Sequence, residues 1–319
     1  MRAGAPPDTF ARALSRRVTA RAVAERLPGA SLIGNPDRCI RAIGALSSRA
    51  ADVLAFWDAD RADDRFAASA AAVVIVPKSI GARPNDRGAL IAVDDVRAAF
   101  IDTVEALLPG SARPPDPAAG IDPSARVHES ASISPLACVG AQVRIGARTR
   151  VAPNAVICDG TEIGDDCVIG PNAVVGWVGL AYHDRADGRR SFFPHLAAVR
   201  IGDRVDVGAQ TCICRGMLSH TTIGDDVKIG SLVYVSHGVA VAPRAWLSAG
   251  TAIAGHATMA TGALLGIGSI VVDNVDLGAG AIVAGGAVVT KTAGAGTKLQ
   301  GVPAQAVDAM RRFGPTPRA

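Results

Sequence analysis

Aliphatic residues return at every sixth position through the middle and the end of this sequence. The first run consists of Ile121, Val127, Ile133, Val139, Ile145, Val151, Ile157, Ile163, Ile169 and Val175. After an interruption the pattern resumes at Ile201, shifts by four residues after Ile213, and continues every six residues from Ile223 to Val289. A small residue follows many of these anchors, as Gly140 does, and the fourth residue after an anchor is typically Ala, Val, Thr or Cys.

A period of six predicts a solenoid built from short strands. An amphipathic helix repeats its apolar residues at three and four positions, and a half-buried strand repeats them at two. A triangular coil of three short strands needs about 18 residues, so the anchors predict about eight coils. Stacked at a strand spacing of about 4.8 Å, these coils would form a prism on the order of 40 Å long. We therefore expect a parallel β-helix over residues 121–294.

Residues 1–108 follow other patterns, which predict a small α/β domain. A helical stretch runs from Val18 to Leu27, and a second, amphipathic one is "VRAAFIDTVEALL". Strand-like runs are "VLAFW", "AAVVIVP" and "ALIAV". Residues 109–120 are rich in Pro and Gly and are expected to form a linker. Residues 295–319, with "GVPAQAVDAMRRFG", are expected to form a tail with a turn and a short helix.

The longest interruption of the period, residues 176–200, combines polar, charged and aromatic side chains in "GWVGLAYHDRADGRRSFFPHLAAVR". A loop expelled from a solenoid can form a wall against a ligand or a neighbouring subunit. The alternative is an insertion that is simply solvated.

Composition agrees with a repetitive β architecture. Hydrophobic residues make up 49% of the 319 residues but aromatic residues only 4%, so the interior must be filled with Ala, Val and Ile, and 35 glycines suit many turns. The net charge of +4 is mild and spread out, which does not favour a nucleic-acid partner. The sequence has no apolar run long enough to predict stable membrane insertion, so we expect a soluble cytoplasmic protein. The six cysteines have no metal-ligand spacing, and neither a disulfide framework nor a metal site is expected.

The sixfold repeat resembles the left-handed parallel β-helix of the hexapeptide acyltransferases, which are usually homotrimers with active sites between subunits. The α/β domain, the linker, a loop ending in "FPHL" and then "IGDRVDVGAQTCICRGMLSHTTIGDDVKIGSLVYVSHGV" most resemble the UDP-3-O-acylglucosamine N-acyltransferases of lipid A synthesis. The resemblance implies amide-forming transfer of an acyl group to the amine of a nucleotide-activated amino sugar. It also implies that the α/β domain of residues 1–108 is of the substrate- or nucleotide-binding kind. The co-substrate would be a thioester of acyl carrier protein or of coenzyme A, with no bound cofactor and no metal.

The same resemblance implies site residues. The family's general base matches His237, and imidazole suits proton removal from an attacking amine near neutral pH. One coil further, Gly255 matches the glycine whose backbone N–H binds the developing oxyanion. Further substrate-binding candidates are His195, Phe193, Tyr182, His220, Ser231, His256 and Trp57. A plain surface position for His256, a surface structural role for His237 and a core role for Trp57 are the alternatives.

Several positions depart from the family pattern. Cys214 stands where the family has Asp, Gly230 and Ser231 replace an Asp-Asn pair, and Gly238 replaces an Asn beside the base. Ala59-Asp60-Arg61-Ala62 stands where the family has a segment whose aromatic ring stacks on uracil.

Three other readings stay open. One is an acetyl-CoA-dependent amino-sugar N-acetyltransferase of surface polysaccharide synthesis, because "GVPAQAV" also fits the ending of such enzymes. Another is a non-catalytic relative that serves as a scaffold. A third is a γ-type carbonic anhydrase, in which His220 and His237 would be neighbours around zinc.

Overall fold

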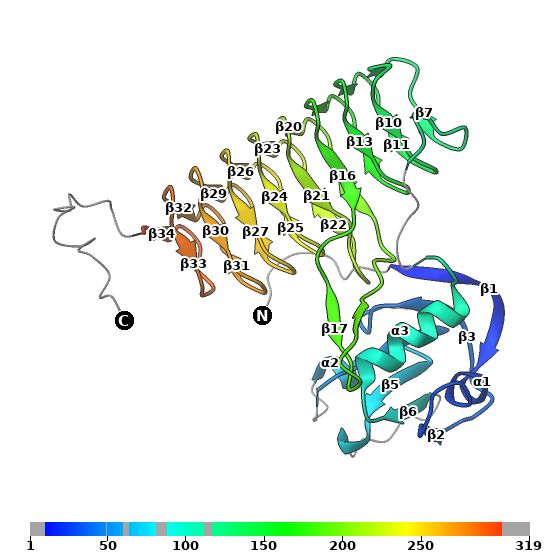
Figure 1. Cartoon of the computed structure of the whole chain (residues 1–319). Coiled ribbons are helices and arrows are strands. Elements are labelled where there is room, and N and C mark those ends of the chain that lie inside the picture. Colours follow the sequence, from blue (N-terminus) through cyan, green and yellow to red (C-terminus); the bar gives the residue numbers. More distant parts are fainter. Residues whose placement is uncertain (1–9, 49, 60–63, 81–87, 112–116, 302–319) are drawn as a thin grey trace, which may run out of the picture.

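The protein consists of a small α/β unit and a long parallel β-solenoid (Figure 1). The computed structural model describes residues 10–48, 50–59, 64–80, 88–111 and 117–301. The predicted fold class is confirmed: three parallel sheets of nine, eight and nine strands form the three faces of the solenoid.

The first solenoid sheet contains β7 (Gly120–Ile121), β10 (Cys138–Val139), β13 (Val156–Ile157), β16 (Val174–Trp177), β21 (Cys212–Cys214), β24 (Tyr234–Val235), β27 (Ala252–Ile253), β30 (Ile270–Val271) and β33 (Val288–Val289). The second contains β8 (Arg126–Val127), β11 (Arg144–Ile145), β14 (Glu162–Ile163), β19 (Val199–Ile201), β22 (Thr221–Ile223), β25 (Ala240–Val241), β28 (Thr258–Met259) and β31 (Asp276–Leu277). The third contains β9 (Ser132–Ile133), β12 (Arg150–Val151), β15 (Val168–Ile169), β20 (Asp206–Val207), β23 (Lys228–Ile229), β26 (Trp246–Leu247), β29 (Leu264–Leu265), β32 (Ile282–Val283) and β34 (Lys298–Leu299).

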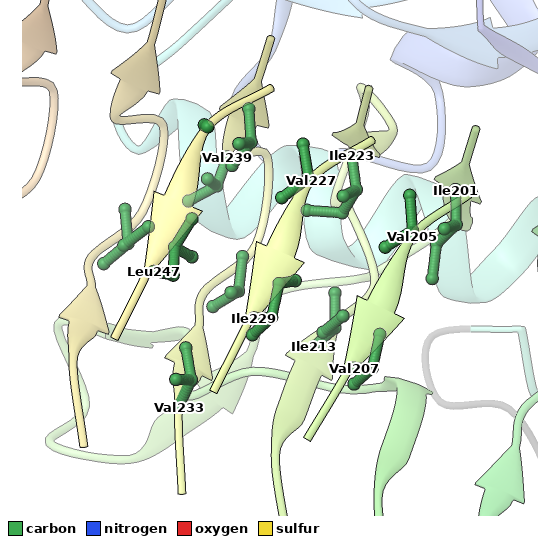
Figure 2. Close-up of a cluster of buried hydrophobic side chains, with 14 of the residues drawn as sticks. Ile201, Val205, Val207, Ile213, Ile223, Val227, Ile229, Val233, Val239 and Leu247 are labelled. Atoms are coloured by element: carbon green, nitrogen blue, oxygen red, sulfur yellow. The ribbon is translucent and has the colours of Figure 1, made fainter. Parts of the chain in front are cut away.

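The anchors of the sixfold pattern stack directly upon one another. Val139 pairs with Ile157, and across the long interruption Ile163 still pairs with Ile201. Figure 2 shows anchors such as Ile213 and Leu247 pointing inward together with residues four positions after an anchor, such as Val227. The anchor and the residue four positions after it are both buried, because the short strand directs the first side chain inward and the following turn directs the second. The interior is narrow, which explains why it is filled with small aliphatic side chains.

From Val139 onward, most corners place one residue at positive φ, three positions after the anchor. Twelve such residues are not glycine, Asn154 and Asn172 among them, so this conformation belongs to the repeat itself. Aspartates also recur at the corners. Asp159 Oδ1 accepts from Ala141 N at 2.8 Å, and Asp165 Oδ1 accepts from Ala147 N at 2.8 Å, each bond joining one coil to the next.

The N-terminal unit is a six-stranded sheet in the order β1-β3-β4-β5-β6-β2. Its strands are β1 (Ala11–Thr19), β2 (Ser31–Gly34), β3 (Cys39–Gly44), β4 (Val53–Phe56), β5 (Val73–Pro77) and β6 (Ala89–Val93), and its helices are α1 (Ala20–Ala24), α2 (Asp64–Ala67), the 3-10 turn η1 (Lys78–Ile80) and α3 (Val96–Leu107). The three expected strands and the amphipathic helix are all present. The expected helix from Val18 is shorter, because Val18 and Thr19 end β1 and the Thr19 side chain caps α1 by accepting from Ala22 N at 3.2 Å.

The end of the solenoid differs from the expected boundary at residue 294. Strand β34 pairs Leu299 with Val283, so one more hexapeptide-like strand closes the stack although its anchor is out of the sixfold register. The short helix expected within residues 295–319 falls in 302–319, outside the described residues.

The excursion at 176–200 folds as a hairpin that reaches the N-terminal unit (Figure 1). Its strands are β17 (Tyr182–Asp184) and β18 (Arg190–Phe192). Phe193, just after β18, stacks on Phe100 of α3 with ring centroids 5.8 Å apart. His183 of β17 forms a hydrogen bond through its Nε2 with Asp95 Oδ2 at 2.8 Å. The excursion is therefore a bridge between the two parts of the chain, not a solvated insertion.

Candidate functional site

His237 lies at the corner between the first and second solenoid sheets, two residues after Val235 of β24. Two glycines leave room for its ring. A Cβ on Gly255 would lie 2.6 Å from His237 Cε1, and a Cβ on Gly179 would lie 3.1 Å from His237 Cδ2. The imidazole is thus held between the next coil and the start of the excursion.

The environment of His237 favours a neutral imidazole. Burial lowers the pKa of His237 below its ordinary value of 6.5, and the nearby Asp273 carboxylate opposes this shift. Its Nδ1 atom is buried and has no hydrogen-bond partner among the described residues. A neutral, partly buried imidazole can accept a proton from a bound reactant.

Gly255, the expected oxyanion donor, is already engaged. Its N–H donates to Asp273 Oδ1 at 2.9 Å, in the same coil-to-coil arrangement that the other corner aspartates make. The expectation that this N–H stands ready for a substrate oxygen is therefore not met in this conformation. Asp273 lies 18 residues, or one coil, after Gly255, so its place next to Gly255 could have been predicted from the sequence.

Three histidines lie side by side at this corner. The ring centroids of His195 and His237 are 5.5 Å apart, and those of His237 and His256 are 5.0 Å apart. They come from three segments of the chain, the excursion and two successive coils. The sequence alone gave no reason to place His195 beside His237.

His195 is held as one neutral tautomer. Its Nε2 accepts from Gly179 N at 3.3 Å, so its Nδ1 carries the proton and donates to Phe193 O at 2.9 Å. Only 1% of this residue is exposed. Because both ring nitrogens are used within the excursion, His195 braces Gly179 against His237.

His256 lies over Gly238, where the acyltransferases that the sequence resembles have an Asn. A Cβ on Gly238 would come 2.5 Å from His256 Nδ1, so glycine there permits this close packing. The φ of +58° at His256 is the ordinary corner conformation of the repeat and does not mark the site.

A cavity of about 1080 Å³ opens beside these histidines and joins three parts of the chain. The solenoid contributes His237 and His256, and the excursion contributes Tyr182 and Phe193. Phe56, Trp57, Asp58 and Arg97 line it from the N-terminal unit. The largely apolar wall with a few polar groups is typical of a small-molecule site.

The aromatic candidates have mixed roles. Phe193 is buried, and it packs against Phe56 and Phe100 while one side faces the cavity. Tyr182 is exposed and contacts Phe192 edge to face. Trp57 contacts Phe66 at 5.9 Å and also lines the cavity, so it is not only a core residue.

Two further charged residues at this cavity escaped the sequence analysis. Arg97 Nε donates to Asp58 Oδ2 at 2.6 Å; Arg97 lines the cavity from α3 and Asp58 from the residues just after β4. The signal for Arg97 was weak, since it is one of three charged residues on an amphipathic helix and nothing local distinguishes it. Of the segment Ala59–Ala62, which the resemblance aligned with a uracil-stacking motif, residues 60–62 lie outside the described residues.

His220 and Ser231 are not part of this group. His220 Nδ1 accepts from Ala198 N at 3.1 Å, and the ring meets Phe10 edge to face in a different cavity. Ser231 lies at the corner between the third and first sheets, on another edge of the prism from His237. His220 and His237 are thus not neighbours lining one cavity, as the carbonic anhydrase reading required. In the described part of the chain, no three His, Cys, Asp or Glu side chains are grouped to hold a metal ion.

Comparison with known proteins supports the assignment of the repeat. Residues 143–176 match the family model described as bacterial transferase hexapeptide (six repeats), and residues 220–254 match the hexapeptide repeat of succinyl-transferase. No helix in the described ranges is long and apolar enough to cross a membrane.

Curated relatives match over short segments. A UDP-3-O-acylglucosamine N-acyltransferase of Verminephrobacter eiseniae is 44% identical over 62 residues, 19% of each chain. Another of that name from Polaromonas naphthalenivorans is 48% identical over 63 residues, 20% of this chain and 17% of the relative. The matched part thus spans about a fifth of these relatives' length. A solved UDP-N-acetylglucosamine acyltransferase of Francisella novicida is 25% identical, with a TM-score of 0.48 over 62% of this chain and 75% of that one.

Proposed function

We propose that this hexapeptide-repeat protein is an N-acyltransferase that moves an acyl group from a thioester to the amine of a nucleotide-activated amino sugar. The observation that carries the proposal is the neutral, partly buried His237 at a cavity formed jointly by the solenoid, the excursion and the N-terminal unit. The partial matches to UDP-3-O-acylglucosamine N-acyltransferases support the same reaction class.

In the proposed reaction the sugar amine attacks the thioester carbonyl carbon. A C–N bond forms, and His237 takes the proton that the amine nitrogen loses. The tetrahedral intermediate then collapses, the C–S bond breaks, and the departing sulfur receives the proton from His237. The Asp273 carboxylate, which raises the pKa of His237, stabilises the transient imidazolium.

The oxyanion of the intermediate needs a fixed donor. Gly255 N–H is the candidate, and in this proposal the thioester oxygen displaces Asp273 Oδ1 from it. Asp273 would then be free to turn toward the imidazolium. The exchange gives up one charge-assisted hydrogen bond to the carboxylate and forms another to the developing oxyanion.

The nucleotide-sugar is proposed to lie against the N-terminal wall of the cavity. Trp57 offers an aromatic face there and Arg97 a guanidinium, while His237 and His256 line the cavity from the solenoid. The donor is a thioester of acyl carrier protein or of coenzyme A, and the protein itself needs no bound cofactor.

We further propose that the protein is a homotrimer. Exposed apolar side chains gather on the first and third sheets and at the corner between them: Leu232, Tyr234, Trp246, Ile267, Ile270, Ile282 and Val288. The second sheet carries none of the exposed large apolar side chains in the described part of the chain, and its outward positions include Arg126, Arg144, Glu162, Arg200 and Asp276. The earlier coils of the third sheet also turn charged residues such as Arg150 and Asp206 outward. An apolar face of this kind favours burial against another copy of the chain.

A non-catalytic scaffold remains the second candidate, because Gly255 N–H is occupied by Asp273. Mass spectrometry of acyl transfer from a panel of acyl carrier protein and acyl-CoA donors to UDP-amino sugars separates the two. Transfer that disappears in His237→Ala supports the enzyme and identifies the donor class. No transfer from any donor, with a folded protein, supports the scaffold.

A further inference from the structure

A second cavity, of about 790 Å³, lies on the other side of the segment Phe193–Leu196 from the histidine site. Its walls are β1, the residues that follow α3, and the corner between the first and second sheets in the early coils. Guanidinium groups dominate its charge. Arg12, Arg126, Arg144 and Arg215 line it, against the carboxylates Asp159 and Glu162.

Arg215 is the unusual member of this set. Only 7% of the residue is exposed, yet its Nη1 has no hydrogen-bond partner among the described residues. Its Nε donates to Ala197 O at 2.7 Å, which fixes the plane of the guanidinium. Burying a charged group without pairing it is costly, so an unused donor at a cavity wall indicates a missing anionic partner.

The two carboxylates do not supply that partner. Asp159 Oδ1 is used by Ala141 N at 2.8 Å, and Glu162 faces Arg200 at 3.8 Å. Asp159 is near enough to attract the charge of Arg215, while Arg12 repels it. Within the described ranges, Arg12, Arg126 and Arg144 form no ion pair either, so the cavity keeps an excess of positive charge.

We propose that this second cavity binds a phosphate group, with Arg215 as the buried donor and Arg126 and Arg144 as the outer ones. A planar guanidinium with an unused N–H matches phosphate oxygens in distance and direction, and several guanidiniums suit a group with more than one negative charge. The site is separate from His237 and does not depend on acyl transfer. Its phosphate could belong to a nucleotide or to the coenzyme of an acyl donor.

The test measures binding of inorganic pyrophosphate by isothermal titration calorimetry at low ionic strength. Wild-type protein should bind, and Arg215→Met should weaken binding at least tenfold, since charge-assisted bonds from a buried donor are lost. Arg144→Gln should weaken it severalfold. The matched control is Arg150→Gln, which lies on the third sheet away from this cavity and should leave binding unchanged.

Arg215→Lys covers the case in which the Met variant does not fold, because it keeps the charge but loses the guanidinium fork. Tenfold weaker binding in the Lys variant supports the site. Competition by UDP identifies a nucleotide source, and competition by coenzyme A identifies the acyl donor. His237→Ala should bind pyrophosphate normally, so failure of the acyltransferase proposal would not affect this result. Absence of binding by the wild type, or equal binding by the Arg215 and Arg150 variants, would overturn the proposal.

Discussion

Asp273 accepts a hydrogen bond from Gly255 N–H at 2.9 Å, and its carboxylate also acts on His237, one coil further back. The three residues occupy the same corner position in successive coils. One side chain thereby couples the charge of the proposed base to the availability of the proposed oxyanion donor.

Two substitutions at Asp273 separate these effects. Asp273→Asn keeps an acceptor for Gly255 N–H but removes the charge that raises the pKa of His237, so the acid limb of kcat/KM should move to lower pH. Asp273→Ala should move the limb similarly and also free the N–H, so its kcat should exceed that of the Asn variant by on the order of tenfold. Equal kcat values for the two variants would argue against a role for Gly255 N–H.

The glycines that flank His237 should not tolerate a methyl group. Gly255→Ala would bring Cβ within 2.6 Å of the ring and Gly179→Ala within 3.1 Å, so the imidazole must shift. For Gly255→Ala we expect kcat/KM to fall by about 100-fold, the scale of a misplacement of about 1 Å. For Gly179→Ala the ring has to move only by a few tenths of an ångström, so we expect a smaller loss of about tenfold. Gly294→Ala is the control, since its Cβ would meet only Thr297 Oγ1 at 3.8 Å. Steady-state kinetics with unchanged activity in the first two variants would contradict this placement of the ring.

Stability should depend on pH through His237. Its pKa is lowered in the folded protein from 6.5, so between the two values the unfolded chain binds more protons and stability rises with pH. As pH falls through 6.5, wild type should therefore lose stability relative to His237→Gln. Thermal unfolding from pH 7.5 to 5.5 measures the difference, with exposed His128→Gln as the control. A constant difference in Tm across this range would speak against the burial of a neutral ring.

The excursion should hold the N-terminal unit in place through Phe193. Phe193→Ala removes a buried ring packed on Phe56 and Phe100, which should lower the free energy of unfolding by about 3 kcal/mol. It should also raise KM, because the same ring lines the histidine cavity. Leu180→Ala in the same excursion, 83% exposed, should have little effect on stability. Denaturant unfolding compares the two, and similar losses would contradict the bridge.

A charged residue on the apolar face should disrupt the proposed trimer. Trp246, 53% exposed on the third sheet, is the largest side chain there, and Trp246→Glu should shift the mass in light scattering from three copies toward one. Thr222→Glu on the second sheet is the control and should leave the mass unchanged. A wild-type monomer, or a trimer unaffected by Trp246→Glu, would remove this face from the assembly.

The architecture follows from the sequence because the repeat is local. Every hexapeptide must place one anchor inward and turn a corner, so the same six-residue pattern appears wherever that geometry occurs, and one coil can be counted from the next. The same counting led from His237 to Gly255, and one more step would have reached Asp273. Strands β4, β5 and β6 and helix α3 were likewise evident from their own periodicity.

The tertiary structure decided everything that depends on the excursion and on which edge of the prism a residue occupies. Residues 176–200 have no period. Gly179 and His195 reach His237 only because the excursion packs on α3 and against the solenoid corner that carries His237. Ser231 and His220 are close to the proposed base in sequence. In the structure, Ser231 lies at another edge of the prism, and His220 lines another cavity. The burial of Arg215 was also invisible, because it arises where the excursion covers its coil, and contacts between segments distant in sequence leave no local pattern.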